Sequence, residues 1–359
     1  MVVDLILFVV GLCALVLGAE ALVRGSSRIA ASFGISPLVV GLTIVAFGTS
    51  APELAVTLGA AYSGNADIAL GNVVGSNIFN ALFILGLSAL ILPLVVDQKL
   101  VREEVPLIIG VSLLLWALAA DGVVSRGEGL LFVVLLGAYV VLLITRSLRE
   151  SSAVRQEYSD AIAAPVDRGW DRHFAVQLLL VAGGLILLVI GARWLVEAAS
   201  AFAAYLGVSE LVVGLTIVAV GTSFPELATS VLAAIRGQTD IAVGNVVGSN
   251  LFNILGVLGV SAVAAPDGLP VAPQILATDL PVMVAVAIAC LPIFFTGNRI
   301  DRWEGGLFLA FYVVYSVHVV MEAGQHAWLG SFNAAVVFYV LPLTTITLLI
   351  LAVRHWRSR

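Results

Sequence analysis

The chain has 359 residues, of which 61% are apolar and 11% are charged, and its formal net charge is −6. Soluble domains are about 45–50% apolar and about 25% charged, so this composition excludes a water-soluble globular protein or a disordered chain. It also excludes a nucleic-acid-binding domain, because no basic cluster carries interleaved aromatic residues. An all-α, polytopic membrane protein remains, since each spanning helix needs roughly 20 apolar residues.

Apolar runs follow one another along the whole chain. The first lacks a preceding basic region and is too long for a signal peptide, so we expect it to be retained. A polar stretch, 147–173, separates the fifth run from the sixth and is too short to bury a core. We interpret it as a cytoplasmic linker. The predicted transmembrane helices are 3–23, 36–61, 68–95, 105–120, 129–145, 174–196, 209–235, 241–264, 278–296, 304–321 and 330–353.

The basic residues predict the orientation of these helices. Of the 17 lysines and arginines, 15 follow odd-numbered spans or lie in the linker. Only Arg126 and Arg193 are expected on the other side of the membrane. Because basic residues are enriched in cytoplasmic loops, we expect a multi-pass protein of the inner (plasma) membrane with its N-terminus outside and its C-terminus in the cytoplasm.

The chain repeats itself at an offset of 173 residues. Residues 34–80 align without a gap with residues 207–253, and 33 of the 47 positions are identical. Each half holds five spans, an odd number, so the halves are predicted to be inverted, as in many secondary transporters. The predicted units are a first repeat (1–146), the linker (147–173), a second repeat (174–321) and an extra C-terminal helix with a cytoplasmic tail (322–359).

Glu53 and Glu226 occupy equivalent positions inside apolar spans. A carboxylate at membrane depth costs about 2.5 kcal/mol or more, so such residues are usually functional. A structural ion pair between helices would need a basic partner, and spans 2, 3, 7 and 8 contain no intramembrane lysine or arginine. The two glutamates therefore need protons or metal cations, which favours a cation-binding site.

Neutral oxygen donors surround both glutamates in the sequence. Pro52 and Pro225 lack an N–H and free a main-chain carbonyl four residues earlier, which breaks the helix beside each glutamate. Ca²⁺ takes six to eight oxygen ligands, which carboxylates, amides and carbonyls supply. Asn72, Asn77, Asn245 and Asn250 are interpreted either as ligands or as partners of the broken backbone. The candidate donors at helical spacing are Thr49, Ser50, Ser76, Asn80, Thr222, Ser223, Ser249 and Asn253.

With its two Gly-Thr-Ser-x-Pro-Glu and two Gly-Ser-Asn-x-x-Asn motifs, the chain resembles the cation/Ca²⁺ exchanger superfamily, especially prokaryotic sodium/calcium exchangers. The resemblance covers about residues 1–321. It implies ten helices, with spans 2, 3, 7 and 8 forming a core around the cation sites and spans 1 and 6 sliding over it. It also implies that Glu53 and Glu226 bridge the cations, and that the Ala46 and Ala219 carbonyls join the donors named above. Some relatives carry an aspartate at the position of Asn253.

We therefore expect an antiporter, and not an enzyme, that exchanges Ca²⁺ for Na⁺ by alternating access. A Ca²⁺/H⁺ or K⁺-dependent Na⁺/Ca²⁺ exchanger is the alternative, because one Ca²⁺, two H⁺ or two Na⁺ would each neutralise two carboxylates. A channel is disfavoured, because inverted halves supply two mutually exclusive closures. No cofactor and no nucleic acid are expected as partners. The expected partners are Ca²⁺, a monovalent counter-ion and the lipid bilayer, and the expected state is a monomer.

Overall fold

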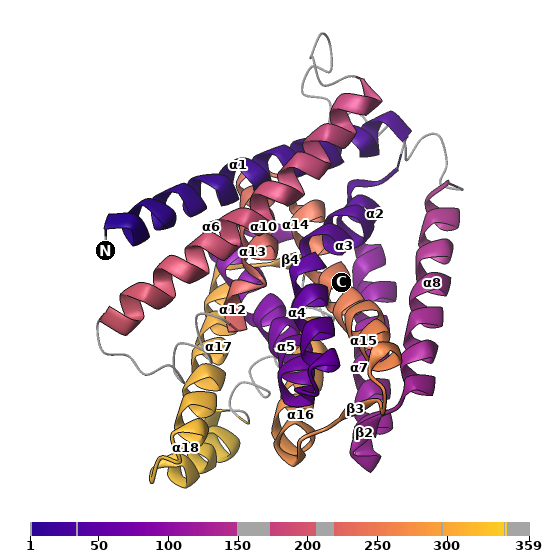
Figure 1. The fold of residues 1–359 in the computed structure, drawn as a ribbon. Helices are drawn as coiled ribbons and strands as arrows, with labels where there is room; N and C mark the ends of the chain where they lie inside the picture. Colours follow the sequence, from indigo (N-terminus) through magenta and orange to yellow (C-terminus); the bar gives the residue numbers. More distant parts are fainter. Residues whose placement is uncertain are drawn as a thin grey trace.

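The computed structural model describes residues 2–33, 35–148, 173–205, 219–295, 297–340 and 342. These residues form a helical bundle in which two long helices, α1 and α10, lie side by side and obliquely across the shorter helices (Figure 1). Segments labelled η are short π- or 3₁₀-helical pieces. The elements up to residue 148 are α1 (Val2–Phe33), α2 (Pro37–Val40), η1 (Gly41–Val45), α3 (Ala46–Thr49), α4 (Ala51–Tyr62), α5 (Ala66–Phe79), η2 (Asn80–Ile84), α6 (Leu85–Ile91), β1 (Leu94–Val95), η3 (Leu100–Glu104), α7 (Val105–Leu118), η4 (Ala119–Asp121), β2 (Val123–Val124) and α8 (Arg126–Leu148).

The described elements after residue 173 follow a similar order. The elements are α10 (Phe174–Tyr205), α12 (Ala219–Gly221), α13 (Phe224–Ile235), α14 (Thr239–Phe252), η7 (Asn253–Leu258), α15 (Gly259–Ala264), β3 (Leu269–Pro270), η8 (Ile275–Asp279), α16 (Leu280–Phe295), β4 (Arg299–Ile300), α17 (Arg302–Ala323), α18 (Leu329–Ala335) and η9 (Val336–Val340).

The predicted all-α membrane fold is confirmed. Among the described residues, eight helices are long and apolar enough to span a membrane, and the bent pair Pro37–Thr49 and Ala51–Tyr62 makes a ninth if it is one span. The predicted span 209–235 lies partly outside the described residues, and α12 and α13 are the helices of its described part. The same holds for the predicted eleventh span, of which α18 and η9 describe the first part.

Helices α1 and α10 are in backbone contact through glycines. A Cβ on Gly18 would lie 2.8 Å from the carbonyl oxygen of Gly184, and a Cβ on Gly191 would lie 2.8 Å from that of Gly11. Residue numbers thus rise along one helix as they fall along the other, and the two helices are antiparallel. Small residues allow this close approach between helices in a membrane. Since α1 and α10 open the two halves of the chain, equivalent helices run in opposite directions.

Two short strand pairs, which the sequence does not predict, join the halves. Strand β1 pairs with β4 in antiparallel register, with Leu94 opposite Ile300, and β2 pairs with β3, with Val124 opposite Leu269. Each pair combines one strand from each half. The strands are only two residues long, too short to produce a recognisable alternation of apolar and polar residues.

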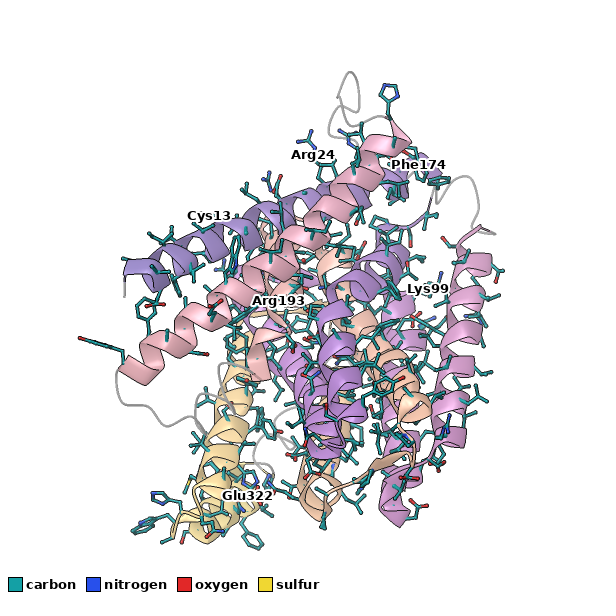
Figure 2. The ribbon with its side chains drawn as sticks, in the orientation of Figure 1. Cys13, Arg24, Lys99, Phe174, Arg193 and Glu322 are labelled. Atoms are coloured by element: carbon teal, nitrogen blue, oxygen red, sulfur yellow. The ribbon has the colours of Figure 1, made fainter. Side chains whose placement is uncertain are left out.

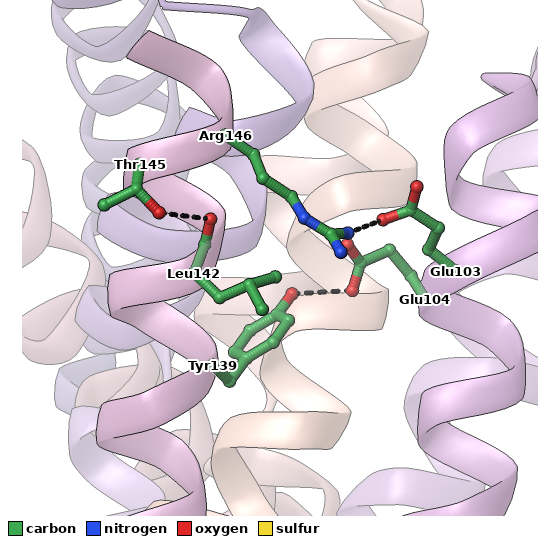
Figure 3. Close-up of polar contacts among 6 residues, drawn as sticks. All are labelled: Glu103, Glu104, Tyr139, Leu142, Thr145 and Arg146. Atoms are coloured by element: carbon green, nitrogen blue, oxygen red, sulfur yellow. Dashed lines mark hydrogen bonds and ion pairs between the residues drawn. The ribbon is translucent and has the colours of Figure 1, made fainter. Parts of the chain in front are cut away.

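Polar contacts fasten the outer helices within each half. The Tyr139 hydroxyl on α8 donates to Glu104 Oε2 at 2.8 Å, and Arg146 forms an ion pair with Glu103 (Figure 3). In the second half, the Tyr315 hydroxyl on α17 donates to Asp279 at 3.0 Å. These contacts join α8 to η3 and α17 to η8, so in each half a tyrosine hydroxyl of the outer helix bonds a carboxylate of a π-helical segment.

Candidate cation site

The two glutamates occupy the first turns of α4 and α13, where the helices restart after a break. The preceding helix ends at Thr49, and α4 begins at Ala51 after a bend of 45°. Proline occupies an early position of both restarted helices, where its missing N–H costs nothing. Glu53 and Glu226 are both fully buried. The positive end of each helix dipole therefore lies beside a carboxylate.

Each glutamate accepts a hydrogen bond from a serine of the other half. Ser50 Oγ donates to Glu226 Oε1 at 3.0 Å, and Ser223 Oγ donates to Glu53 Oε1 at 2.8 Å. The two contacts are equivalent, because both pairs of residues are related by the offset of 173. The sequence places Ser50 and Glu53 on one face of a helix, but the structure gives each serine the opposite glutamate. The predicted site residues of both halves therefore meet at one place.

The threonines and two of the undecided asparagines form the next layer. Thr49 Oγ1 donates to Asn245 Oδ1 at 3.1 Å, and Thr222 Oγ1 donates to Asn72 Oδ1 at 3.3 Å. Asn72 Nδ2 contacts the main-chain oxygen of Glu53 at 3.4 Å, and Asn245 Nδ2 contacts that of Glu226 at 3.3 Å. In the structure, these two asparagines bond the backbone that carries the glutamates.

The side-chain amide groups of Asn72 and Asn245 also bond two hydroxyls that are not among the site residues predicted from the sequence. Asn72 Nδ2 donates to Thr57 Oγ1 and Asn245 Nδ2 donates to Ser230 Oγ, both at 2.9 Å. Thr57 and Ser230 are fully buried. Each follows its glutamate by four residues, so a polar residue one helical turn further on was the available signal.

Asn80 and Asn253 begin the two π-helical segments η2 and η7. Such π-turns frequently occur at functional sites, where they redirect side chains. Asn80 Nδ2 donates to Asn250 Oδ1 and Asn253 Nδ2 donates to Asn77 Oδ1, both at 3.1 Å. The Oδ1 atoms of Asn80 and Asn253 remain without a hydrogen-bond partner.

Asn77 and Asn250 form hydrogen bonds between the two halves, next to Asn80 and Asn253 of the site. Asn77 Nδ2 donates to the main-chain oxygen of Asn250 at 3.2 Å, and Asn250 Nδ2 donates to that of Asn77 at 3.3 Å. Their Oδ1 atoms receive the amide groups of the asparagines that begin η2 and η7. The Nδ2 groups of Asn77 and Asn250 thus bond the main chain, and their Oδ1 atoms orient the side chains of Asn253 and Asn80.

Four fully buried carboxylate and amide oxygens around this centre lack a hydrogen-bond partner: Glu53 Oε2, Glu226 Oε2, Asn80 Oδ1 and Asn253 Oδ1. An unsatisfied buried polar atom costs about 1–3 kcal/mol, and a charged one costs more. The four atoms come in two repeat-related pairs and are all acceptors. Such a donor set suits a hard cation, which binds carboxylate and amide oxygens.

The remaining predicted residues lie around the same centre. Ser76 Oγ lies 3.1 Å from Ser223 Oγ, and Ser249 Oγ is buried without a partner. The Ala46 carbonyl oxygen receives the Ser50 N–H at 3.1 Å and lies 3.4 Å from Thr49 Oγ1. Ala219 begins α12, and its side chain lies outside the described residues. No group of three or more His, Cys, Asp or Glu side chains is gathered as a metal site in the described part of the chain.

The sequence profile described as sodium/calcium exchanger protein matches residues 3–145 and 176–321. The chain belongs to this family. It is 35% identical over 344 residues to the sodium/calcium exchanger MaX1 of Methanosarcina acetivorans, covering 88% of this chain and 98% of MaX1. It is 38% identical over 288 residues to the inner membrane protein YrbG of Escherichia coli, covering 79% of this chain and 86% of YrbG.

A solved structure of the sodium-calcium exchanger NCX_Mj, soaked with Na⁺ and Ca²⁺, has the same fold. The TM-score is 0.74 with 31% sequence identity, over 88% of this chain and 97% of that one. The chain is therefore a multi-pass membrane protein of an exchanger family, and the resemblance drawn from its repeated motifs is confirmed.

Proposed function

We propose that this exchanger-family protein moves Ca²⁺ against Na⁺ across the plasma membrane, binding the cations between Glu53 and Glu226. The observation that carries the proposal is the set of four buried, unpartnered oxygens from both halves. Bound cations would give these oxygens partners, whereas the described residues place no basic side chain in contact with either glutamate. Ser76, Ser249 and the Ala46 and Ala219 carbonyls would complete the oxygen shells.

Two carboxylates set the charge that the cations must balance. One Ca²⁺ neutralises them, and so do two Na⁺, which is why the two ions exclude each other at a shared site. A third Na⁺ would leave a positive charge and make the exchange electrogenic. The names of MaX1 and NCX_Mj support Na⁺ as the counter-ion.

We propose that the two halves, 1–146 and 174–321, alternate the access of this site to the two sides of the membrane. The antiparallel arrangement of α1 and α10 supports inverted halves, as do the reciprocal serine–glutamate contacts. In inverted repeats, the two halves can exchange conformations, which opens one side as the other closes. The segments 147–173 and 322–359 lie outside this transport unit.

The proposed orientation follows the basic residues, with the N-terminus outside and the C-terminus in the cytoplasm. Arg236, Arg299 and Arg302 then face the cytoplasm, as do the basic residues of the linker. The name of YrbG supports an inner membrane location.

The test is Ca²⁺ flux into liposomes that contain the purified protein. Vesicles loaded with Na⁺ and diluted into Na⁺-free medium are expected to take up ⁴⁵Ca²⁺, and vesicles without a Na⁺ gradient are not. Parallel gradients of H⁺ and K⁺ separate the related exchange modes. Ca²⁺ uptake that depends on a pH gradient and not on a Na⁺ gradient would identify H⁺, and not Na⁺, as the counter-ion. Uptake that needs no counter-ion on the opposite side would indicate a channel.

A further inference from the structure

Helix α1 is fastened to the loop between α13 and α14 by two polar contacts. Arg236 Nη2 lies 2.6 Å from Glu20 Oε2 in an ion pair, and Ser27 Oγ lies 2.8 Å from Gln238 Oε1 and 2.7 Å from the Val23 carbonyl oxygen. Ser27 is buried, whereas the ion pair is half-exposed. Both contacts join α1 to the end of the helix that carries Glu226, so they can fix where α1 sits on the core.

The equivalent contacts are missing in the other half. At an offset of 173, Glu20 corresponds to Arg193, Ser27 to Ser200, Arg236 to Ser63 and Gln238 to Asn65. Ser200 Oγ is buried without a hydrogen-bond partner. Arg193 is exposed on α10, well away from Phe174 at the start of that helix, and forms no ion pair among the described residues (Figure 2). The polar contacts that join α1 to the loop after α13 therefore have no counterpart between α10 and the loop after α4.

The shapes of the two loops do not explain this difference. Gly64 and Gly237 have nearly the same φ, +73° and +74°. Asn65 has φ −92° and ψ 63°, and Gln238 has φ −91° and ψ 61°. Because the loop backbones match, the asymmetry lies in where α1 and α10 sit on the core: α1 packs against α13, and α10 does not pack against α4 in the equivalent way.

We propose that Glu20, Ser27, Arg236 and Gln238 are positioning residues that hold α1 in one of two positions of the transport cycle. In the other position, the halves exchange conformations, so Ser200 bonds Asn65 and the contact between Ser27 and Gln238 is broken. This inference rests on the proposed alternating access. It explains why Ser200 carries a buried hydroxyl without a partner in the position described here.

The two positions are not equally stabilised. When the halves exchange conformations, Arg193 approaches Ser63, which cannot form an ion pair. Only the position described here therefore gains the ion pair between Glu20 and Arg236. An exposed ion pair changes an equilibrium by about two- to fivefold, so this pair biases the cycle without locking it.

Cross-linking of paired cysteines tests the inference in membranes. In a Cys13→Ala, Cys290→Ala background, Ser27→Cys with Gln238→Cys reports the position described here, and Ser200→Cys with Asn65→Cys reports the other. A short bifunctional thiol reagent is expected to cross-link both pairs, and each cross-link is expected to stop ⁴⁵Ca²⁺ exchange until it is cleaved. Glu20→Gln should lower the ratio of the Ser27–Gln238 cross-link yield to the Ser200–Asn65 cross-link yield about two- to fivefold. Ser63→Glu, which gives Arg193 a partner, should also lower it.

The control is Glu103→Gln, which removes the exposed ion pair with Arg146 within one half and should leave the ratio unchanged. The inference is overturned if the Ser200 and Asn65 positions never cross-link while the Ser27 and Gln238 positions do. It is equally overturned if Glu20→Gln and Ser63→Glu leave the ratio at the control value. The cross-linking readout does not depend on which ion is carried, so an absence of Na⁺-driven Ca²⁺ flux would contradict the proposed function alone.

Discussion

The Ser223 hydroxyl lies 2.8 Å from Glu53 Oε1, although the two residues belong to opposite halves of the chain. The same contact joins Ser50 to Glu226 at 3.0 Å. Each carboxylate is thus held at one oxygen by the other half, while its second oxygen stays unpartnered. This arrangement orients the free oxygens of both glutamates, and neither half can provide it alone.

Replacing the glutamates tests the site directly. Glu53→Gln and Glu226→Gln each remove one negative charge and keep the shape of the side chain, so each is expected to abolish Na⁺-driven ⁴⁵Ca²⁺ uptake. The variants should fold, because an amide in place of a buried charge lowers the cost of burial. Size-exclusion profiles and thermal melting in detergent check the fold. Wild-type flux in the double variant would disprove the site.

The two serines should be equally important. Ser50→Ala and Ser223→Ala leave the carboxylates in place but remove the group that orients them, so we expect Ca²⁺ affinity to fall about 10- to 100-fold in each case. The measurement is the Ca²⁺ concentration for half-maximal exchange. Ser88→Ala is the matched control, since Ser88 is also buried but lies on α6 outside the site. A loss in only one serine variant would show that the halves do not contribute equally.

Protons should compete with Ca²⁺ at the site. The glutamates bind a cation only when they are deprotonated, so lowering the pH on the Ca²⁺ side raises the Ca²⁺ concentration needed for half-maximal exchange. At saturating Ca²⁺ the rate should recover, because cation binding displaces the protons. Initial rates over a grid of pH and Ca²⁺ concentrations provide the check. A rate that falls with pH and does not recover at high Ca²⁺ would place the titrating group elsewhere.

The glycine contact between α1 and α10 should tolerate no side chain. A Cβ on Gly184 would lie 2.7 Å from the Leu22 nitrogen and 2.8 Å from the Gly18 oxygen, so the two backbones would have to separate. We expect Gly184→Ala to destabilise the protein by about 1–3 kcal/mol, as overpacking does. Gly183→Ala is the control, because its Cβ would meet no atom within 4 Å. Equal melting temperatures for the two variants would argue against a tight contact.

Much of this architecture was predictable from apolar length and from the repeat. Runs of about 20 apolar residues predict spans whatever their neighbours are, and the offset of 173 predicts that Glu53 and Glu226 are equivalent. The sequence could not predict that Ser50 bonds Glu226 and not Glu53. Helical spacing describes one helix, whereas this contact depends on how helices of opposite halves cross. The strand pair of Leu94 and Ile300 was missed because two residues carry no pattern.

The sequence leaves open whether Asn72, Asn77, Asn245 and Asn250 are ligands or supports, whereas it predicts Asn80 and Asn253 as ligands, and only the structure shows how such asparagines differ. Asn72 and Asn80 both lie one or two turns from other polar residues, and both are short amides. Only the hydrogen bonds distinguish them: Asn72 has both amide atoms engaged, and Asn80 keeps a free oxygen. Which atom of an amide remains free is set by its neighbours in space.

Asn77 and Asn250 each donate to the main chain of the other, so their contact is self-complementary, as in an interface between two identical subunits. The reciprocal serine–glutamate bonds have the same property. Two identical half-length chains in opposite orientations could make the same reciprocal contacts. The covalent joining of the halves permits each to diverge in sequence, so that Glu20 and Arg236 can form an ion pair for which the other half, with Arg193 and Ser63, has no counterpart.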